Sequence, residues 1–272
     1  MNGHTFKHEA MATTFQVIIA GQAPAYAQQA AAAAFRELDR LEAELSRFVE
    51  TSDLARANRL AEGENIFIGE DTLRCLVTAA EISGATGRAF DPAYASEGAP
   101  GDPGEAALFA LDPGSHTLTS LAKRLQLDLG AVGKGYALDR MADVLCDWDA
   151  TAACLQSGGS TVLALVPPPG ADGWPVGVGD QTVPVAHRAL SASGIGVQGE
   201  HLVDPRTGQP ALRTTRVWAF ALSAAVADAL STAFFVMTDD EVAAFCRQHP
   251  EYQAVLTRAG GRTVWIGAPA SL

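Results

Sequence analysis

The chain has 272 residues, of which 48% are hydrophobic and 18% charged, and its mean hydropathy is +0.09. This composition predicts a globular protein with a sizeable core and excludes a disordered chain. The formal net charge of −12 leaves few cations for a basic face, which argues against nucleic-acid binding and against attraction to an anionic membrane. A polyanionic ligand would need local help from backbone N–H groups, a helix N-terminus or a metal.

The first half of the chain predicts one strand and two helices. Residues 13–20 are β-branched and aromatic, which favours a strand. Over about residues 25–48 apolar side chains recur at steps of three and four, which predicts a helix whose buried face ends at Phe48. A second helix is predicted over about residues 71–83. The stretch 96–104 is rich in Gly, Pro and Ala and predicts a loop, where a boundary between two lobes could fall.

The second half mixes short strands with helices, so we expect an α/β or α+β fold. Helices are predicted over about residues 136–146, 225–237 and 240–248. Strands are predicted at residues 108–111, 116–118, 125–129, 152–156, 161–166, 175–178, 182–186, 217–222, 252–257 and 262–266, the last two as a hairpin.

The cysteines and the N-terminus bear on the cellular compartment. The four cysteines have no CxxC spacing and read as scattered thiols, neither a metal cluster nor a disulfide framework. The N-terminal residues lack the apolar core of a secretory signal, and no apolar stretch is long enough for a membrane span. We therefore expect a cytoplasmic protein without membrane insertion, or an exported one if a leader has been removed.

Residues 128–139 contain the first candidate site. A predicted strand ends there, Gly130, Gly133 and Gly135 follow within six residues, and a helix begins. Such a turn can expose consecutive backbone N–H groups beside a helix N-terminus, and Lys134 adds a cation, so a diphosphate could bind. The spacing is neither that of a P-loop nor GxGxxG. The alternative is a tight turn with an exposed lysine.

Residues 201–208 form the second candidate site. His201 lies three residues before Asp204, so the histidine could share a proton with the aspartate and act as a general base. The Asp-Pro and Thr-Gly pairs of this segment are typical of turns. The alternative is a polar turn with a hydrogen-bonded histidine.

Asp228 and Thr232 form the third candidate site. They are four residues apart on a strongly apolar predicted helix and therefore share one face. A carboxylate in such a helix is costly unless it is paired or binds a cation, and carboxylate and hydroxyl oxygens suit Mg²⁺. The alternative is an aspartate that caps a neighbouring backbone group.

Together these segments resemble the ApbE family of FAD:protein FMN transferases. The family patterns D-L-G-G-I-A-K-G-Y-A-x-D, H-x-I-D-P-x-T-G and A-D-A-x-A-T-A match residues 128–139, 201–208 and 227–233 in the same order. Shorter traces of the family lie at residues 11–15, 45–58, 87–92, 158–160 and 191–194. The chain resembles a shortened member, because the stretches between residues 92 and 128 and before residue 201 are short for the family.

The resemblance implies one ApbE-like domain over residues 1–272, with an α+β fold of mixed sheets and packed helices and room for two lobes around a central ligand cleft. It implies Mg²⁺-dependent transfer of FMN from FAD to a Thr or Ser hydroxyl of an acceptor flavoprotein, with release of AMP. The alternatives are a protein that binds or hydrolyses FAD without an acceptor, and a non-catalytic scaffold.

The resemblance also implies roles for individual residues. Asp228, Thr232 and the backbone near Gly133 would bind the metal. His201, with Asp204, would serve as base or orienting group for the acceptor hydroxyl. The residues expected beside FAD are Met11, Ser46, Phe90, Asp91, Gly130, Lys134, Gly158, Gly159, Ser193 and Gly194.

Overall fold

A computed structural model describes residues 3–97, 107–194, 203–211, 216–258 and 263–267. Its centre is an eight-stranded sheet in which every neighbouring pair is antiparallel, in the order β1-β2-β6-β7-β10-β13-β14-β15. These strands are β1 (Gly3–Ala10), β2 (Thr13–Ala20), β6 (Ala153–Ser157), β7 (Thr161–Ala164), β10 (Arg188–Gly194), β13 (Arg216–Ala221), β14 (Gln253–Thr257) and β15 (Thr263–Ile266).

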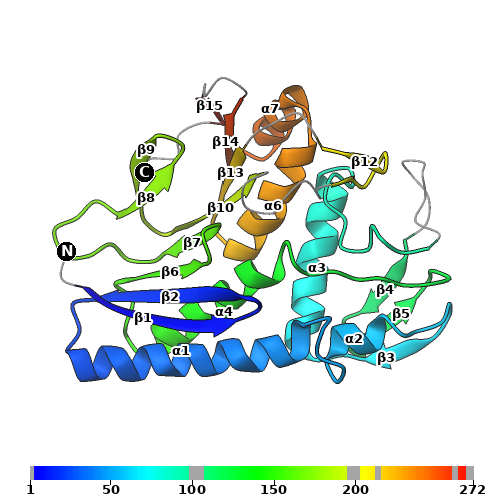
Figure 1. The fold of residues 1–272 in the computed structure, drawn as a ribbon, viewed down its shortest axis with the longest axis horizontal. Coiled ribbons are helices and arrows are strands. Elements are labelled where there is room, and N and C mark those ends of the chain that lie inside the picture. The colour runs from blue at the N-terminus through cyan, green and yellow to red at the C-terminus, as the bar shows by residue number, and fades with distance from the viewer. Residues whose placement is uncertain (1–2, 98–106, 195–202, 212–215, 259–262, 268–272) are drawn as a thin grey trace.

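Helices cover one face of this sheet (Figure 1). They are α1 (Pro24–Leu45), α3 (Glu70–Ala85), α4 (Gly133–Asp147) and α6 (Ala224–Val236), with α7 (Asp239–Gln248) beside β14 and β15. Alternate residues of each strand point to the helices: Phe15, Val17 and Ile19 of β2 are fully buried there. The main core therefore lies between the sheet and these helices.

The opposite face of the sheet carries a hairpin of β8 (Trp174–Val178) and β9 (Gln181–Val185). Trp174 and Val176 of this hairpin pack with Trp218 and Phe220 of β13 in a second, smaller core. The sheet is thus apolar on both faces at its centre, and only one face is available to the helices that form the candidate site.

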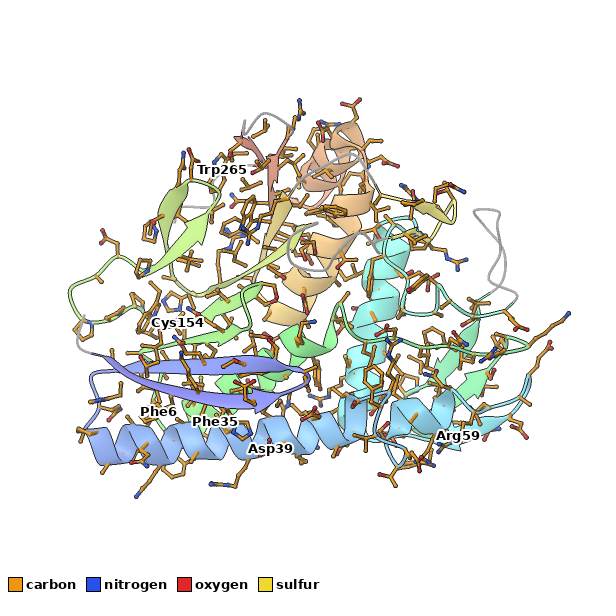
Figure 2. All side chains as sticks on the ribbon, viewed as in Figure 1. Phe6, Phe35, Asp39, Arg59, Cys154 and Trp265 are labelled. Atoms are coloured by element: carbon orange, nitrogen blue, oxygen red, sulfur yellow. The ribbon has the colours of Figure 1, made fainter. Side chains whose placement is uncertain are left out.

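The N-terminal hairpin of β1 and β2 turns at Met11 and Ala12, which both have positive φ, at 49° and 58°. Residues other than glycine rarely adopt this backbone conformation, so contacts with the surrounding structure must stabilise this tight turn. The Met11 N–H donates to Oε1 of Glu42 on α1 at 2.8 Å. Phe6 of β1 and Phe35 of α1 lie at the seam between hairpin and helix (Figure 2).

A smaller sheet, in the order β3-β5-β4, lies beyond α3 and the short helix α2 (Asp53–Ala57). Its strands are β3 (Asn65–Phe67), β5 (Thr117–Ser120) and β4 (Phe109–Asp112). The remaining pair, β11 (Val203–Asp204) and β12 (Gln209–Pro210), frames the turn after Asp204. Within the described ranges no helix is long and apolar enough to cross a membrane.

The predicted α+β class is confirmed, and most predicted elements are present within a few residues of their expected bounds. The predicted first helix is too long, because α1 ends at Leu45 and Ser46 has extended backbone angles. Phe48 consequently does not pack on a helix face: it is 80% exposed. Elements that the sequence did not predict are β1, α2, β3, β10, β11 and β12. The proposed lobe boundary at residues 96–104 falls mostly outside the described residues.

The predicted strand at residues 125–129 is wrong: the segment has no ladder partner in the described structure. Side chains bind its backbone instead. Asn58 accepts from the N–H of Leu127 at 2.7 Å and donates to its carbonyl at 3.0 Å. Ser96 Oγ accepts from the N–H of Gln126 at 2.8 Å. These bonds satisfy the backbone groups that a strand would have satisfied, and they fix the entry to the glycine-rich segment.

Candidate functional site

We call residues 130–135 the glycine turn. It overlaps the start of α4, which begins at Gly133 without a side-chain cap. Gly135 brings α4 against the start of α6: a Cβ atom built there would lie 2.2 Å from the carbonyl oxygen of Ala224. Only glycine permits this approach of the two helices. The N-terminus of α4 and the first turn of α6 therefore meet at the glycine turn.

Asp139, farther along α4, binds the same end of α6. Its carboxylate accepts from the Ser223 hydroxyl at 2.7 Å and from the N–H groups of Ala224 and Ala225 at 2.7 and 2.9 Å. These are N–H groups at the start of α6 that have no partner within the helix. Burial raises the pKa of Asp139, and the hydrogen bonds from α6 oppose that shift.

Asp228 lies on α6 beside the glycine turn, and its side chain is buried. Its Oδ2 accepts from the Gly135 N–H at 3.3 Å and lies 4.0 Å from Nζ of Lys134. Its Oδ1 accepts from the hydroxyls of Ser191 and Thr161 at 3.1 and 3.3 Å. A carboxylate at the N-terminus of α4 also interacts favourably with the helix dipole.

Thr232 lies one turn after Asp228 on the same face of α6, as the spacing predicted. Its Oγ1 is buried and has no hydrogen-bond partner within the described structure. An unpartnered buried hydroxyl is costly, so its presence one turn from a buried carboxylate fits a residue that binds a ligand. Oxygen atoms of this kind suit Mg²⁺.

A metal at this position would depend on few side chains. In the part of the chain that the structure describes, no three His, Cys, Asp or Glu side chains are grouped closely enough to hold an ion together. One carboxylate, one hydroxyl and backbone oxygen would remain as protein ligands. Such an incomplete set is typical of Mg²⁺ sites, in which substrate phosphates and water supply the other ligands.

A hollow of about 470 Å³ lies on one side of the glycine turn, between it and the end of α1, and we call it the α1 hollow. Its wall includes the predicted residues Met11, Ser46, Gly130, Gly133 and Lys134, together with the exposed ring of Phe48. In the same wall, Arg47 forms an ion pair of 2.9 Å with Asp128. Lys134 also donates to the Gly130 carbonyl.

A second hollow of about 260 Å³ lies on the other side of the glycine turn, and we call it the α6 hollow. Thr232 and the predicted residues Phe90, Asp91 and Gly130 line it. Asp128 and Gly130 border both hollows, so the two adjoin at the glycine turn. The structure thus places eight of the predicted residues around two hollows that share Asp128 and Gly130.

Local bonds hold two predicted residues, Asp91 and Asp204. The Asp91 carboxylate accepts from Arg88 and, at 2.8 Å, from the Ala93 N–H, so it stabilises its own turn at the rim of the α6 hollow. Asp204 accepts from Arg206 at 2.9 and 3.0 Å, and Arg206 continues to Glu241 on α7. His201 lies outside the described residues, so its pairing with Asp204 stays a prediction.

The remaining predicted residues border neither hollow. Ser193 is fully buried in β10 and lies 2.9 Å from the Ser231 hydroxyl. Gly194 ends that strand. Gly158 has a φ of 55° at the turn between β6 and β7, where a Cβ atom would lie 2.7 Å from Oγ1 of Thr13. For Gly158 and its neighbour Gly159, the structure indicates a role in the turn.

A model of the ApbE family matches residues 11–256. The chain belongs to the ApbE family. The match includes every predicted site residue, and the glycine turn and α6 lie well inside it.

Among ApbE relatives, the FAD:protein FMN transferase of Treponema pallidum (strain Nichols) is 31% identical over 166 residues. The aligned region is 52% of this chain and 46% of the relative, so it spans less than half of that protein.

Solved ApbE structures share the fold. The ApbE protein of Thermotoga maritima has a TM-score of 0.82 at 23% identity, with 97% of each chain covered. The apo form of the flavinyl transferase ApbE of Pseudomonas stutzeri has a TM-score of 0.83 at 22% identity, covering 97% of this chain and 95% of that one. At these identities the likeness establishes the ApbE-like α+β fold and nothing finer.

Proposed function

We propose that this chain transfers FMN from FAD to a Thr or Ser hydroxyl of an acceptor flavoprotein, in a Mg²⁺-dependent reaction that releases AMP. The observation that carries the proposal is the meeting of Asp228 and Thr232 with the glycine turn, between two adjoining hollows. The name of the Treponema relative, an FAD:protein FMN transferase, supports the same reaction.

In this proposal FAD lies across the glycine turn, with its diphosphate beside Lys134 and a ring system in the hollow on either side. The positive end of the α4 dipole and the Lys134 ammonium favour an anion at this point, against the net charge of −12. Phe48 offers an exposed aromatic ring in the α1 hollow against which a flat ring can stack.

Asp228, Thr232 and a backbone carbonyl near Gly133 would hold Mg²⁺. The unpartnered Oγ1 of Thr232 and the carboxylate of Asp228 fit this role by chemistry and placement. A bound Mg²⁺ would neutralise the diphosphate and stabilise charge on the transferring phosphoryl group. The glycine turn would hold the diphosphate so that one phosphorus faces the acceptor.

The acceptor hydroxyl oxygen forms the new bond to the phosphorus of FMN while the bond to the bridging oxygen breaks, and AMP leaves with that oxygen. The hydroxyl proton passes to His201 as general base. Asp204 would orient His201 with the Oδ2 lone pair that Arg206 leaves free, and Arg206 anchors Asp204 to α7 through Glu241.

Intact mass spectrometry of an acceptor domain incubated with the purified protein, FAD and Mg²⁺ tests this proposal. The acceptor should gain the mass of FMN less one water, and only when Mg²⁺ is present. Asp228→Asn should abolish the gain. Asp143→Asn, which changes an exposed carboxylate on α4, should keep it. FMN and AMP without a modified acceptor would instead indicate hydrolysis of FAD, and an unchanged FAD pool would indicate binding alone.

A further inference from the structure

Four buried hydroxyls, on two strands and on α6, surround Asp228 from the side opposite the glycine turn. They belong to Thr161 of β7, Ser191 and Ser193 of β10, and Ser231 of α6, and each is at most 1% exposed. None of them borders either hollow. Thr161 and Ser191 instead bond directly to the Asp228 carboxylate, so they can act on the site through Asp228.

The hydroxyls divide their bonds between the side chain and the backbone of Asp228. Thr161 and Ser191 donate to Oδ1 at 3.3 and 3.1 Å. Ser231 donates to the backbone carbonyl of Asp228 at 2.9 Å, and Ser193 lies 2.9 Å from Ser231. Each hydroxyl has one proton, so Thr161 and Ser191, which are 3.0 Å apart, can both donate to Oδ1 only if neither donates to the other. Both hydroxyls then donate their hydrogen bonds to Asp228.

This division leaves the two carboxylate oxygens of Asp228 in different states. Oδ1 accepts hydrogen bonds from two hydroxyl groups of the sheet. Among the described residues, Oδ2 accepts one hydrogen bond, from the Gly135 N–H at 3.3 Å, and the Lys134 ammonium lies 4.0 Å away. Because hydrogen bonds to one oxygen fix the rotation of the carboxylate, Oδ2 is turned towards the glycine turn with lone pairs still free.

We propose that Thr161 and Ser191 are positioning residues that orient Asp228 so that its Oδ2 is presented to Mg²⁺. The proposal deepens the proposed function and rests on it for the identity of the metal. The two residues stabilise the buried charge of Asp228 from behind without touching the metal, as the outer partners of metal-binding carboxylates do. Residues of the sheet thereby set the orientation of Asp228, a metal-binding side chain that lies on a helix.

The test compares a double variant, Thr161→Val with Ser191→Ala, with the native protein and two controls. The double variant removes both donors to Oδ1 and changes little volume. The first control is Ser157→Ala. Ser157 is opposite Thr161 in the pairing of β6 and β7, is fully buried, and has a hydroxyl without a described partner. The second control is Thr161→Ser, which keeps a hydroxyl donor and should therefore keep the native response to Mg²⁺.

Two readouts are needed. The first is the rise in the melting temperature of the full chain as MgCl₂ is titrated without FAD. The second is the Mg²⁺ dependence of FMN transfer, from which the half-saturating concentration and the kcat at saturation are obtained. The double variant should require about 10- to 100-fold more Mg²⁺ in both readouts, with most of kcat recovered at saturation. Ser157→Ala and Thr161→Ser should stay near the native value.

The outcomes separate the inference from the function on which it rests. A double variant with the half-saturating concentration of Ser157→Ala would contradict the positioning role and leave the transferase proposal intact. A transfer rate that falls by the same factor at every Mg²⁺ concentration would also contradict it, because the hydroxyls would then serve only the packing of α6. A native protein that responds to Mg²⁺ in neither readout would overturn the metal assignment itself, and the positioning role with it.

Discussion

Thr232 carries a hydroxyl oxygen that is buried on α6 and has no partner in the described structure. The metal-free protein gains nothing from this hydroxyl, because a buried polar atom without a hydrogen bond costs about 1–3 kcal/mol. Valine has nearly the same shape and lacks the polar atom. At this residue, function and stability are therefore expected to respond to substitution in opposite directions.

We predict that Thr232→Val leaves the metal-free protein as stable as the native one or up to about 1–3 kcal/mol more stable. The same variant should lose most of the melting-temperature rise that MgCl₂ produces in the native protein. Thermal melts with and without MgCl₂ provide both measurements. A variant that melts well below the native protein without metal would mean that the hydroxyl has a structural partner, and the metal assignment would lose its main support.

The sequence alone predicted the Asp228 and Thr232 pair, because two polar residues four apart on an apolar helix share a face whatever surrounds them. It did not predict Thr161 and Ser191, since a buried Ser or Thr in a strand carries no local signal of its partner. Asn58 is similar: its two bonds to Leu127 join residues 69 positions apart. Such contacts become visible only when the strands and loops are placed in space.

Gly135 is the point at which two elements, α4 and α6, come closest. A Cβ atom there would lie 2.2 Å from the Ala224 oxygen and 2.8 Å from the Cα of Ala225, and both are backbone atoms that cannot rotate away. The helices would have to separate. Because α6 carries Asp228 and Thr232, the separation would also move the candidate metal site relative to the glycine turn.

We predict that Gly135→Ala destabilises the protein by about 1–3 kcal/mol or more, as overpacking does. Gly84→Ala is the matched control, because Gly84 also lies in a helix, α3, but a Cβ atom there meets nothing within 4 Å. That control should stabilise by about 0.5–1 kcal/mol, since alanine favours a helix over glycine. Urea unfolding measures both. The same sign for the two variants would contradict the close approach of α4 and α6.

Asp71 joins three helices at one carboxylate. From α3 it accepts from Tyr136 of α4 at 2.7 Å and from Arg40 of α1 at 2.5 Å, and Arg140 of α4 lies 3.3 Å away. Burial alone would raise the pKa of Asp71. The hydrogen bonds from Tyr136 and Arg40 and the charges of both arginines outweigh burial and hold the pKa below its ordinary value of 3.8.

This shift predicts a pH dependence of the free energy of unfolding. A carboxylate whose pKa is lowered by folding stabilises the folded state above pH 3.8, and that contribution is lost as the pH falls through the folded-state pKa. We predict that Asp71→Asn is less stable than the native protein at pH 6 and that the difference shrinks below pH 3.8. Urea unfolding from pH 6 to pH 3 checks it. A difference that grows with acidification would contradict the lowered pKa.

At the scale of the whole molecule, the sequence predicted the α+β class but not the order of the eight strands. β10, a central strand, reads Arg-Ala-Leu-Ser-Ala-Ser-Gly, and its small residues lack the β-branched pattern that marks a strand. All seven of its residues are buried, because neighbours cover both faces. β1 was missed for the opposite reason, since it is an edge strand with alternate residues exposed.

The arrangement of the whole molecule explains why the site lies where it does. The β8–β9 hairpin covers one face of the main sheet, so α4 and α6 can lie only on the other. There, the end of α1, the glycine turn and the turn after Asp204 come together from distant parts of the sequence. The two hollows are therefore a product of the packing of these elements.

The most direct test of the account is the amount of AMP released for each covalently flavinylated acceptor, measured in one reaction with FAD and Mg²⁺. Transfer of FMN predicts a ratio of one to one with the native protein, and neither product with Asp228→Asn. AMP in clear excess over modified acceptor, or AMP formed at the same rate without any acceptor, would contradict the account and identify the protein as an FAD hydrolase.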